Sequence, residues 1–264
     1  MKKKKFSAPK VDKIEELSAE LLVANQKLRD SEAARTKMLE NISHDLRAPL
    51  TAVRSTVEYL QELNPSQELD WSEWEQIINL LDMRTKTLEA LVSDLYYLTC
   101  LDNEKISMSY EQVPLGQFLE EYFYSVESDQ KYAERMLYLE VPEEATAEVS
   151  IDVHQMTRVL DNLFTNALKY SDKGASITLG MEKPQESVVI FYVKDTGMGI
   201  PKGALEKIFE RTYTVSDART PSKQSGSGFG LAIVQSIVKK HCGKITCMSE
   251  LGIGSIFIIE LPKI

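Results

Sequence analysis

One histidine of the sequence stands in a setting that suits a nucleophile. His44 is followed directly by Asp45, and Arg47 and Pro49 come three and five positions after it. A neutral imidazole is available near pH 7, because the reference pKa of histidine is about 6.5, and an adjacent acid can orient the ring or take its proton. Pro49 removes a helical hydrogen bond to the carbonyl group of Asp45, a strain that a helix built only for stability would avoid. The alternative is a solvent-exposed histidine without a chemical role.

A second candidate site lies on a helix predicted over residues 153–170. Positions i, i+4, i+7 and i+8 on one face of that helix are occupied by Asn162, Asn166, Lys169 and Tyr170. An amide oxygen can coordinate Mg²⁺, a lysine can neutralise phosphate charge, and an aromatic ring can lie against a base. A polar face exposed to solvent is the competing interpretation, and the spacing alone does not decide between the two.

The run D-T-G-M-G-I starts at Asp195, directly after an apolar strand predicted over residues 187–194. A carboxylate at the end of a buried strand can accept a hydrogen bond from an adenine amine. Gly197 and Gly199 would let the backbone approach the ring and adopt unusual dihedral angles. This pattern is weak by itself, because Asp and Gly are also ordinary turn residues.

A second glycine-rich run, G-S-G-F-G-L, precedes the last amphipathic helix. Its glycines are Gly226, Gly228 and Gly230, and Leu231 ends the run. Free backbone amides at the start of a helix bind anions, and the helix dipole adds to that attraction. The preceding polar segment, 211–225, is rich in Thr and Ser and has the composition of a mobile lid.

These motifs together resemble a known family. The run H-D-L-R-A-P-L from His44 resembles the phospho-acceptor box of sensor histidine kinases. Four further stretches resemble, in order and spacing, the N, G1, F and G2 boxes of the ATP-binding domain that histidine kinases share with gyrase-type ATPases and ninety-kilodalton heat-shock chaperones, namely 162–170, 195–199, 208–211 and 226–231. The resemblance covers roughly residues 37–264.

The resemblance implies ATP and Mg²⁺ as cofactors and a role for each matching residue. Those roles are Mg²⁺ coordination by Asn166 with Asn162 beside it, phosphate binding by Lys169, contact with the base by Tyr170, and adenine recognition by Asp195. Arg219 in the lid is a candidate contact to the γ-phosphate. The sequence departs from the family at Thr212, Thr214 and Phe229, which bears on the details of the lid rather than on nucleotide binding.

The implied activity is phosphorylation of His44 by ATP, followed by transfer to an aspartate in the receiver domain of a separate response regulator. An ATP-driven conformational clamp of the gyrase or chaperone type is one alternative, but such relatives carry a water-activating glutamate where this sequence has Asn162. A nucleotide-binding scaffold is another. The family ties phosphatase activity to a Thr or Asn four residues after the histidine. Ala48 stands there and cannot hydrogen-bond through its side chain, which predicts weak phosphatase activity.

Heptad patterns around His44 predict helices that need a partner. Apolar residues at intervals of three and four over 11–28 indicate a coiled-coil or linker helix within residues 1–36. One helix that ends near residue 63 and another over 71–102 would form an antiparallel hairpin, and two hairpins would pair as a four-helix bundle. We therefore expect a homodimer through a dimerisation and phosphotransfer domain at residues 37–104.

Residues 110–264 show mixed strand and helix patterns, which predict a two-layer α/β sandwich as the ATP-binding domain. Helices are expected over 113–131, 153–170 and 229–242. Strands are expected over 136–141, 147–151, 176–182, 187–194, 244–250 and 255–261.

The composition of the chain bears on its partners and its cellular setting. The chain has 264 residues and a net charge of −9, which argues against nucleic acid as a partner. No apolar run approaches the ~20 residues that span a bilayer, and three cysteines without metal or redox spacing suit a cytoplasmic setting. The lysines at 2–5 belong either to a solvated terminus or to a juxtamembrane cluster. In the second case the chain is the cytoplasmic part of a membrane-attached sensor. His154 and His241 lack catalytic neighbours and are expected at the surface or at helix ends.

Overall fold

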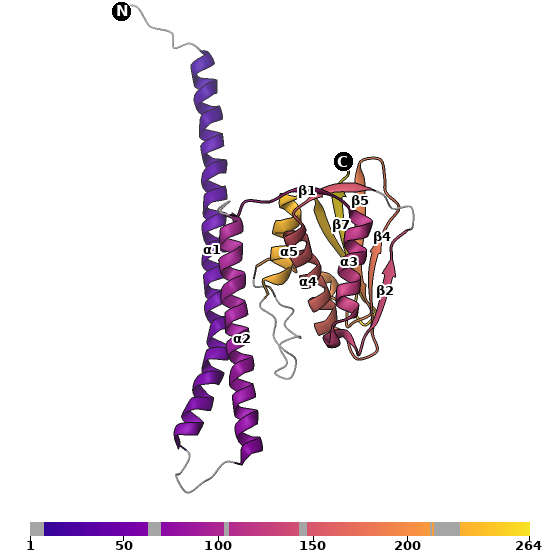
Figure 1. Cartoon of the computed structure of the whole chain (residues 1–264). Coiled ribbons are helices and arrows are strands. Elements are labelled where there is room, and N and C mark those ends of the chain that lie inside the picture. The colour runs from indigo at the N-terminus through magenta and orange to yellow at the C-terminus, as the bar shows by residue number, and fades with distance from the viewer. Residues whose placement is uncertain (1–7, 63–69, 103–105, 143–146, 212, 214–227) are drawn as a thin grey trace, which may run out of the picture. The chain divides into compact units, whose positions relative to one another are not determined.

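Figure 1 shows the computed structural model of the chain. The structure describes residues 8–62, 70–102, 106–142, 147–211, 213 and 228–264; within its helices a few side chains, including those of His44 and Asp45, are not described. The chain divides into two compact units, Met1–Trp71 and Ser72–Ile264.

The first unit is dominated by one long helix, α1, which spans Ala8–Glu62. The predicted linker helix and the predicted helix around His44 therefore form a single element. Pro49 lies inside this helix, which continues through it in spite of the missing hydrogen bond. Apolar side chains on α1 such as Leu39 and Leu50 are more than half exposed.

The second helix, α2, spans Trp71–Asp102, the range that the heptad pattern predicts. Burial increases along it: Trp71 and Ile78 near its start are exposed, whereas Leu91 and Leu98 near its end are buried. Among the described residues, no helix combines the length and the apolar character needed to cross a membrane.

The rest of the second unit is a two-layer α/β sandwich. Its five-stranded sheet has the order β2-β4-β5-β7-β6. Strands β2 and β4 are parallel and the other neighbours are antiparallel. The strands are β2 (Met136–Glu140), β4 (Ser176–Met181), β5 (Val188–Asp195), β6 (Lys244–Glu250) and β7 (Gly254–Pro262). One face is covered by helices α3 (Leu115–Glu127), α4 (Val153–Lys169) and α5 (Gly230–Lys240), as Figure 1 shows.

Two expectations for this region need correction. The strand predicted over 147–151 does not join the main sheet: β3 (Glu148–Ile151) pairs antiparallel with β1 (Glu111–Pro114), a strand that the sequence patterns missed. The helix predicted over 113–131 is shorter, because Pro114 ends β1 and serves as the N-cap of α3, and the chain leaves the helix after Glu127. A separate 3₁₀ turn, Gln130–Tyr132, follows and is capped by the side chain of Asp129.

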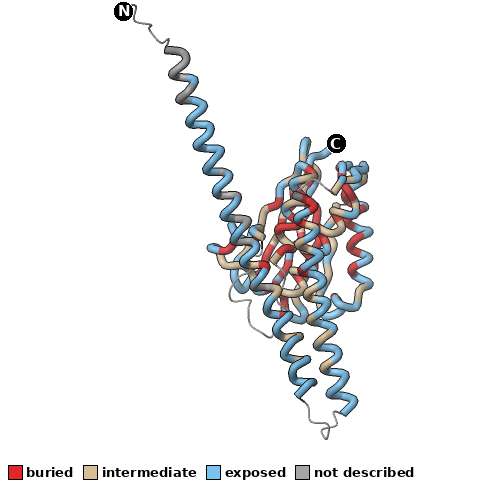
Figure 2. Tube along the Cα trace, turned by 90° about the vertical axis from the view of Figure 1, so that its left-hand side faces the viewer, coloured by how far each residue is buried: buried red, intermediate tan, exposed pale blue. Residues whose placement is uncertain are grey.

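The core lies between the helices and the covered face of the sheet. Alternate residues of the central strands point into it, as the pleat of a strand requires, and include Val189, Phe191, Val193, Phe257, Ile259 and Leu261. The apolar side of α4 packs on them with Leu160, Leu163 and Phe164, all at most 1% exposed. Figure 2 shows the buried residues gathered in the sandwich, while exposed residues predominate along α1. The burial of one side of α4 leaves its polar side for the site described next.

Candidate nucleotide-binding site

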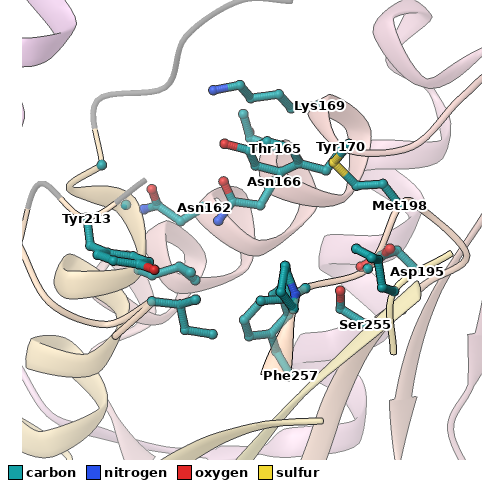
Figure 3. A pocket seen from close by; sticks show the side chains of 18 of the residues that line it. Asn162, Thr165, Asn166, Lys169, Tyr170, Asp195, Met198, Tyr213, Ser255 and Phe257 are labelled. Carbon is teal, nitrogen blue, oxygen red and sulfur yellow. The ribbon is translucent and has the colours of Figure 1, made fainter. Parts of the chain in front are cut away.

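A cavity of about 330 Å³ opens along the polar side of α4 (Figure 3). The other walls come from the loop after β5, the start of α5 and strand β7. Most of the residues that the sequence predicts to bind the nucleotide are found in the lining of this cavity: Asn162, Asn166, Lys169, Tyr170, Asp195, Gly199, Gly228, Gly230 and Leu231. Gly197 is adjacent in the same loop. Two predicted residues, Arg219 and Gly226, lie outside the described residues.

The middle of α4 and the first turn of α5 contact one another through a glycine. The side-chain amide of Asn162 donates to the carbonyl oxygen of Arg158 at 2.8 Å, which fixes the amide in the groove. A Cβ atom on Gly230 would lie 2.7 Å from Oδ1 of Asn162. Only glycine therefore lets the start of α5 approach the Asn162 side chain this closely. The amide oxygen and the free backbone N–H groups at the helix start consequently face the same space.

Lys169 is the cation among the described residues that line the cavity. It is the last residue of α4, and its Nζ lies 5.0 Å from the centre of the Tyr170 ring. Burial lowers the pKa of its ammonium group to about 8. Among the described residues no acidic side chain forms an ion pair with it. A lysine that is desolvated without an anionic partner is a favourable place for a phosphate group, because the phosphate supplies the missing charge.

The loop after β5 is held by hydrogen bonds at the other end of the cavity. Asp195 is 8% exposed, and its Oδ1 accepts the N–H of Gly197 at 2.8 Å. Burial raises the pKa of the Asp195 carboxyl, and hydrogen bonds from the backbone N–H groups of Gly197 and Ser255 oppose that shift. The carboxylate is thus buried and oriented at the end of its strand.

Both glycines of this loop are required by close backbone contacts. The N–H of Met198 donates to the carbonyl oxygen of Tyr170 at 2.9 Å, and a Cβ atom on Gly197 would lie 2.4 Å from that oxygen. Gly199 has a φ of +70°, and a Cβ atom on it would lie 2.0 Å from the carbonyl oxygen of Glu250. The loop therefore locks the end of α4 to the end of β5.

The cavity also contains residues that the sequence patterns did not identify. They include Thr165, Met198, Ile200, Pro201, Tyr213, Leu251, Ser255 and Phe257. Ser255 reaches the site because β7 pairs with β5 in the register that places Ser255 opposite Asp195. The one signal in the sequence is Gly254, which has a φ of +137° and on which a Cβ atom would lie 2.0 Å from the Asp195 carbonyl oxygen. That signal gains its meaning only once the strand pairing is known.

The residues present fit ATP and a magnesium ion. The walls combine apolar side chains such as Ile200 and Phe257 with few polar groups, which is typical of small-molecule sites. Among the described residues no group of three or more His, Cys, Asp or Glu side chains is placed to hold a metal ion. A cation beside Asn166 would therefore take most of its ligands from phosphate and water, as Mg²⁺ commonly does.

The three histidines are placed differently by the structure. His44 lies on α1 with Asp45, but the described side chains do not include theirs, so their predicted roles stay predictions. His154 is exposed near the start of α4. His241 follows the last residue of α5, as a helix-end residue, but it is buried with 4% exposure rather than on the surface. Its burial is possible because both ring nitrogens have partners: Nε2 accepts the N–H of Asp152 and Nδ1 contacts the carbonyl oxygen of Ile237.

Two family models match the chain. Residues 34–104 match the His Kinase A (phospho-acceptor) domain, and residues 151–264 match the histidine kinase-, DNA gyrase B- and HSP90-like ATPase. The first match contains the helix segment around His44 together with α2. The second contains α4, α5 and the loop after β5, and thus every described residue that lines the cavity except Asp94 of α2.

Curated relatives and solved structures agree with these matches. The chain is 36% identical over 233 residues to the sensor protein kinase WalK of Staphylococcus saprophyticus, which covers 88% of the chain and 37% of the relative. It is 33% identical over 247 residues to the sensor histidine kinase WalK of Bacillus subtilis, with 91% and 38% covered. The chain thus spans well under half the length of these relatives.

The fold matches that of histidine kinase ThkA in complex with the response regulator protein TrrA, with a TM-score of 0.70 at 23% identity, over 90% of this chain and 65% of that one. The expected fold class, a helical hairpin region followed by an α/β sandwich, is confirmed. The chain joins a phospho-acceptor domain to an ATPase domain of the histidine kinase type and is homologous to the WalK sensor histidine kinases.

Proposed function

We propose that this chain is a protein histidine kinase that transfers the γ-phosphoryl group of ATP to His44 and then to an aspartate of a response regulator. The observation that carries the proposal is the cavity along α4, where three separate sequence motifs converge on one pocket. The phospho-acceptor motif lies in the same chain. The homology to WalK supports the same activity.

The chemistry requires little of the protein beyond placement and charge. A ring nitrogen of neutral His44 forms the new bond to the γ-phosphorus while the bond to the oxygen of ADP breaks, and Asp45 orients the ring or accepts its proton. Asp195 would recognise the adenine amine, and Lys169 would neutralise phosphate charge. Phosphoryl transfer relies almost entirely on such positioning and electrostatic stabilisation.

A magnesium ion would be held by the amide oxygen of Asn166, with Asn162 beside it, and by the phosphates. It would neutralise the charge that develops during transfer. Asn162 stands where clamp ATPases carry their water-activating glutamate, and an amide cannot act as a base. We therefore favour transfer to histidine over hydrolysis coupled to a clamp.

Labelling with γ-³²P-ATP tests the proposal. The protein should acquire a phosphoryl group that is labile in acid and stable in base, and His44→Gln should abolish the label. His154→Gln is the matched control, because His154 is an exposed histidine outside the cavity. Label that persists in His44→Gln would refute the assigned acceptor. Steady release of phosphate without protein label would favour the clamp, and ATP binding without either would favour a scaffold.

The partner in the second transfer would be the receiver domain of a response regulator. The structure of ThkA that this chain resembles is a complex with a response regulator protein, which supports a partner of that class. Ala48, exposed on α1, offers no hydrogen bond to hold a water molecule against an aspartyl phosphate. Phosphatase activity toward the regulator should therefore be weak, and Ala48→Thr should increase it if the position is the one that matters.

We also propose a homodimer and an input from an upstream sensor. The exposed apolar side chains of α1 and of the first half of α2 are those that a four-helix bundle would cover. A monomeric mass in solution at micromolar concentration would contradict the dimer.

The catalytic chain would work in the cytoplasm, and α1 would transmit the signal from a sensor or membrane segment.

A further inference from the structure

A buried histidine outside the nucleotide cavity connects the two helices that line it. His241 follows α5, and its Nε2 accepts the backbone N–H of Asp152 at 2.9 Å. Its Nδ1 lies 2.8 Å from the carbonyl oxygen of Ile237. A backbone N–H can only donate and a carbonyl can only accept, so the ring must be neutral with its proton on Nδ1.

The side chain of Asp152 extends this connection to the segment that enters the sandwich. Its Oδ1 accepts the N–H of Gln155 at 3.0 Å and caps α4, while its Oδ2 accepts the N–H of Ser109 at 2.9 Å. The hydroxyl of Tyr110 donates to the carbonyl oxygen of Lys240 at 2.7 Å. Its ring meets that of His241 edge-on, with 5.3 Å between centroids. We call Ser109, Tyr110, Asp152 and His241 the His241 junction.

The junction lies at one end of the contact between α4 and α5, and the cavity lies at the other. At the junction, the end of α5 binds the start of α4. At the cavity, Gly230 at the start of α5 meets the side chain of Asn162. The two helices therefore run in opposite directions, and the two ends of α5 contact the start and the middle of α4. A shift of α4 along α5 would move Asn162, Asn166 and Lys169 together relative to the start of α5.

We propose that His241 is a positioning residue, which sets α4 against α5 through its bond to the Asp152 N–H and thereby places the nucleotide-binding side chains of α4. The inference rests on the proposed function of the cavity. Ser109 and Tyr110 are close in the chain to the segment that follows α2, so the junction also ties the entry of the sandwich to the start of α4. Removing the acceptor would leave a buried donor unpaired, which favours displacement of that turn.

Two amide substitutions separate the two bonds of the ring. Glutamine at 241 extends far enough for its Oε1 to accept the Asp152 N–H in place of Nε2. Asparagine is shorter and can replace only the donor to Ile237. His241→Gln should therefore keep the contact that positions α4, whereas His241→Asn and His241→Ala should lose it. His154→Gln and His154→Asn, at the exposed histidine of α4, control for the substitutions themselves.

The first measurement is the affinity of the full chain for ATP with Mg²⁺, together with KM and kcat of autophosphorylation. His241→Asn should weaken ATP binding and raise KM by about tenfold, since misplacement of binding groups by a fraction of an ångström has effects of this order. The rate at saturating ATP should change less. His241→Gln should stay within about threefold of the wild type by the same reasoning.

The second measurement needs no nucleotide. Amide hydrogen exchange over residues 106–112 and 152–160 should accelerate in His241→Asn and not in His241→Gln, because only the first opens the junction. If both variants lose thermal stability while their ATP affinity equals that of the wild type, His241 is structural and the inference is wrong. If the Asn variant binds ATP as well as the Gln variant, it is also wrong. A wild-type protein that fails to bind ATP would instead refute the proposed function of the cavity.

Discussion

The two ends of the nucleotide cavity differ in whether their polar and charged groups have partners within the protein. At the Asp195 end (Asp195, Gly197 and Met198), backbone groups are already paired: Gly197 N–H with the Asp195 carboxylate, and Met198 N–H with the Tyr170 carbonyl oxygen. The carbonyl oxygen of Met198 in turn accepts the N–H of Gly252 at 2.7 Å. At the Lys169 end (Asn162, Asn166 and Lys169), the ammonium group is desolvated and has no acidic partner among the described residues.

This difference assigns different tasks to the two ends. The Asp195 end is a preorganised surface that can recognise a base without rearrangement, so its contribution should be the same for nucleoside and nucleotide. The Lys169 end carries an electrostatic cost that an anion removes, so its contribution should appear only with phosphates. Paired measurements with ATP and adenosine can therefore test the comparison.

Gly197→Ala should have the largest effect, on both ligands alike. The added Cβ would lie 2.4 Å from the Tyr170 carbonyl oxygen and 2.8 Å from Oδ1 of Asp195, so the loop would have to move. Calorimetric affinities for ATP and adenosine should both fall by about a hundredfold, as expected for displaced binding groups. Gly203→Ala is the control, because a Cβ there would meet nothing within 4 Å. Adenosine binding equal to that of the control would show that the Asp195 end is not rigid.

Asn166→Ala should lower the affinity for ATP almost as much as Gly197→Ala does, and it should leave the affinity for adenosine almost unchanged. The variant removes the amide oxygen proposed to hold Mg²⁺, and loss of even an outer-shell partner at a metal site typically costs about 10–100-fold in metal affinity or activity. Chelation of Mg²⁺ should reproduce the loss in the wild type. Asn166→Asp retains an oxygen ligand and should recover much of the binding. An equal loss for adenosine would mean that the substitution had disturbed α4 as a whole.

Asp195→Asn should lower the affinity for both ligands by about tenfold. This corresponds to the loss of a hydrogen bond to a charged group, which contributes about 1.5 kcal/mol. The amide can also donate, so the variant should improve its relative affinity for inosine, which has a carbonyl oxygen in place of the adenine amine. The ratio of adenosine to inosine affinity measures this directly. A ratio unchanged from the wild type would remove Asp195 from base recognition.

The sequence could predict the parts of the site that follow from local geometry. Asn162, Asn166, Lys169 and Tyr170 share one side of α4 because the 3.6-residue period is a property of the helix itself, and the structure brings all four to the cavity. Residues supplied by strand pairing could not be predicted in the same way. Ser255 enters only through the register of β5 with β7, which contacts between residues far apart in the chain decide.

The misjudged features have the same cause. Strand β1 is four residues long and pairs only with β3, so its four residues carry too little pattern to identify a strand. His241 lies at a helix end, which is one of the two predicted settings, but its burial was not predicted because it depends on the N–H of Asp152, 89 positions away. The sequence predicts Gly199 in the nucleotide loop, but the reason that glycine is needed there, the carbonyl oxygen of Glu250, comes from a contact far along the chain. Each depends on a contact that a local pattern does not contain.

The pH dependence of ATP binding should show the most specific effect. Burial lowers the pKa of Lys169 from 10.5 to about 8, so between these values the unfolded chain holds more protons than the free folded protein. The stability of the free protein should therefore rise with pH across that window. A bound triphosphate favours the charged ammonium and raises its pKa, so binding above pH 8 takes up a proton, and ATP affinity should fall by up to about tenfold per pH unit.

Lys169→Met should remove this pH dependence and bind ATP at all pH values as weakly as the deprotonated wild type. Lys173→Met is the matched control, because Lys173 is exposed and paired with Glu134. Adenosine should show no such dependence in any variant, since it carries no phosphate. Proton uptake measured by calorimetry in buffers of different ionisation enthalpy locates the titrating group. If the pH dependence persists in Lys169→Met, or if adenosine binding shows it as well, the titrating group is not Lys169. The proposed electrostatic difference between the two ends of the cavity would then be wrong.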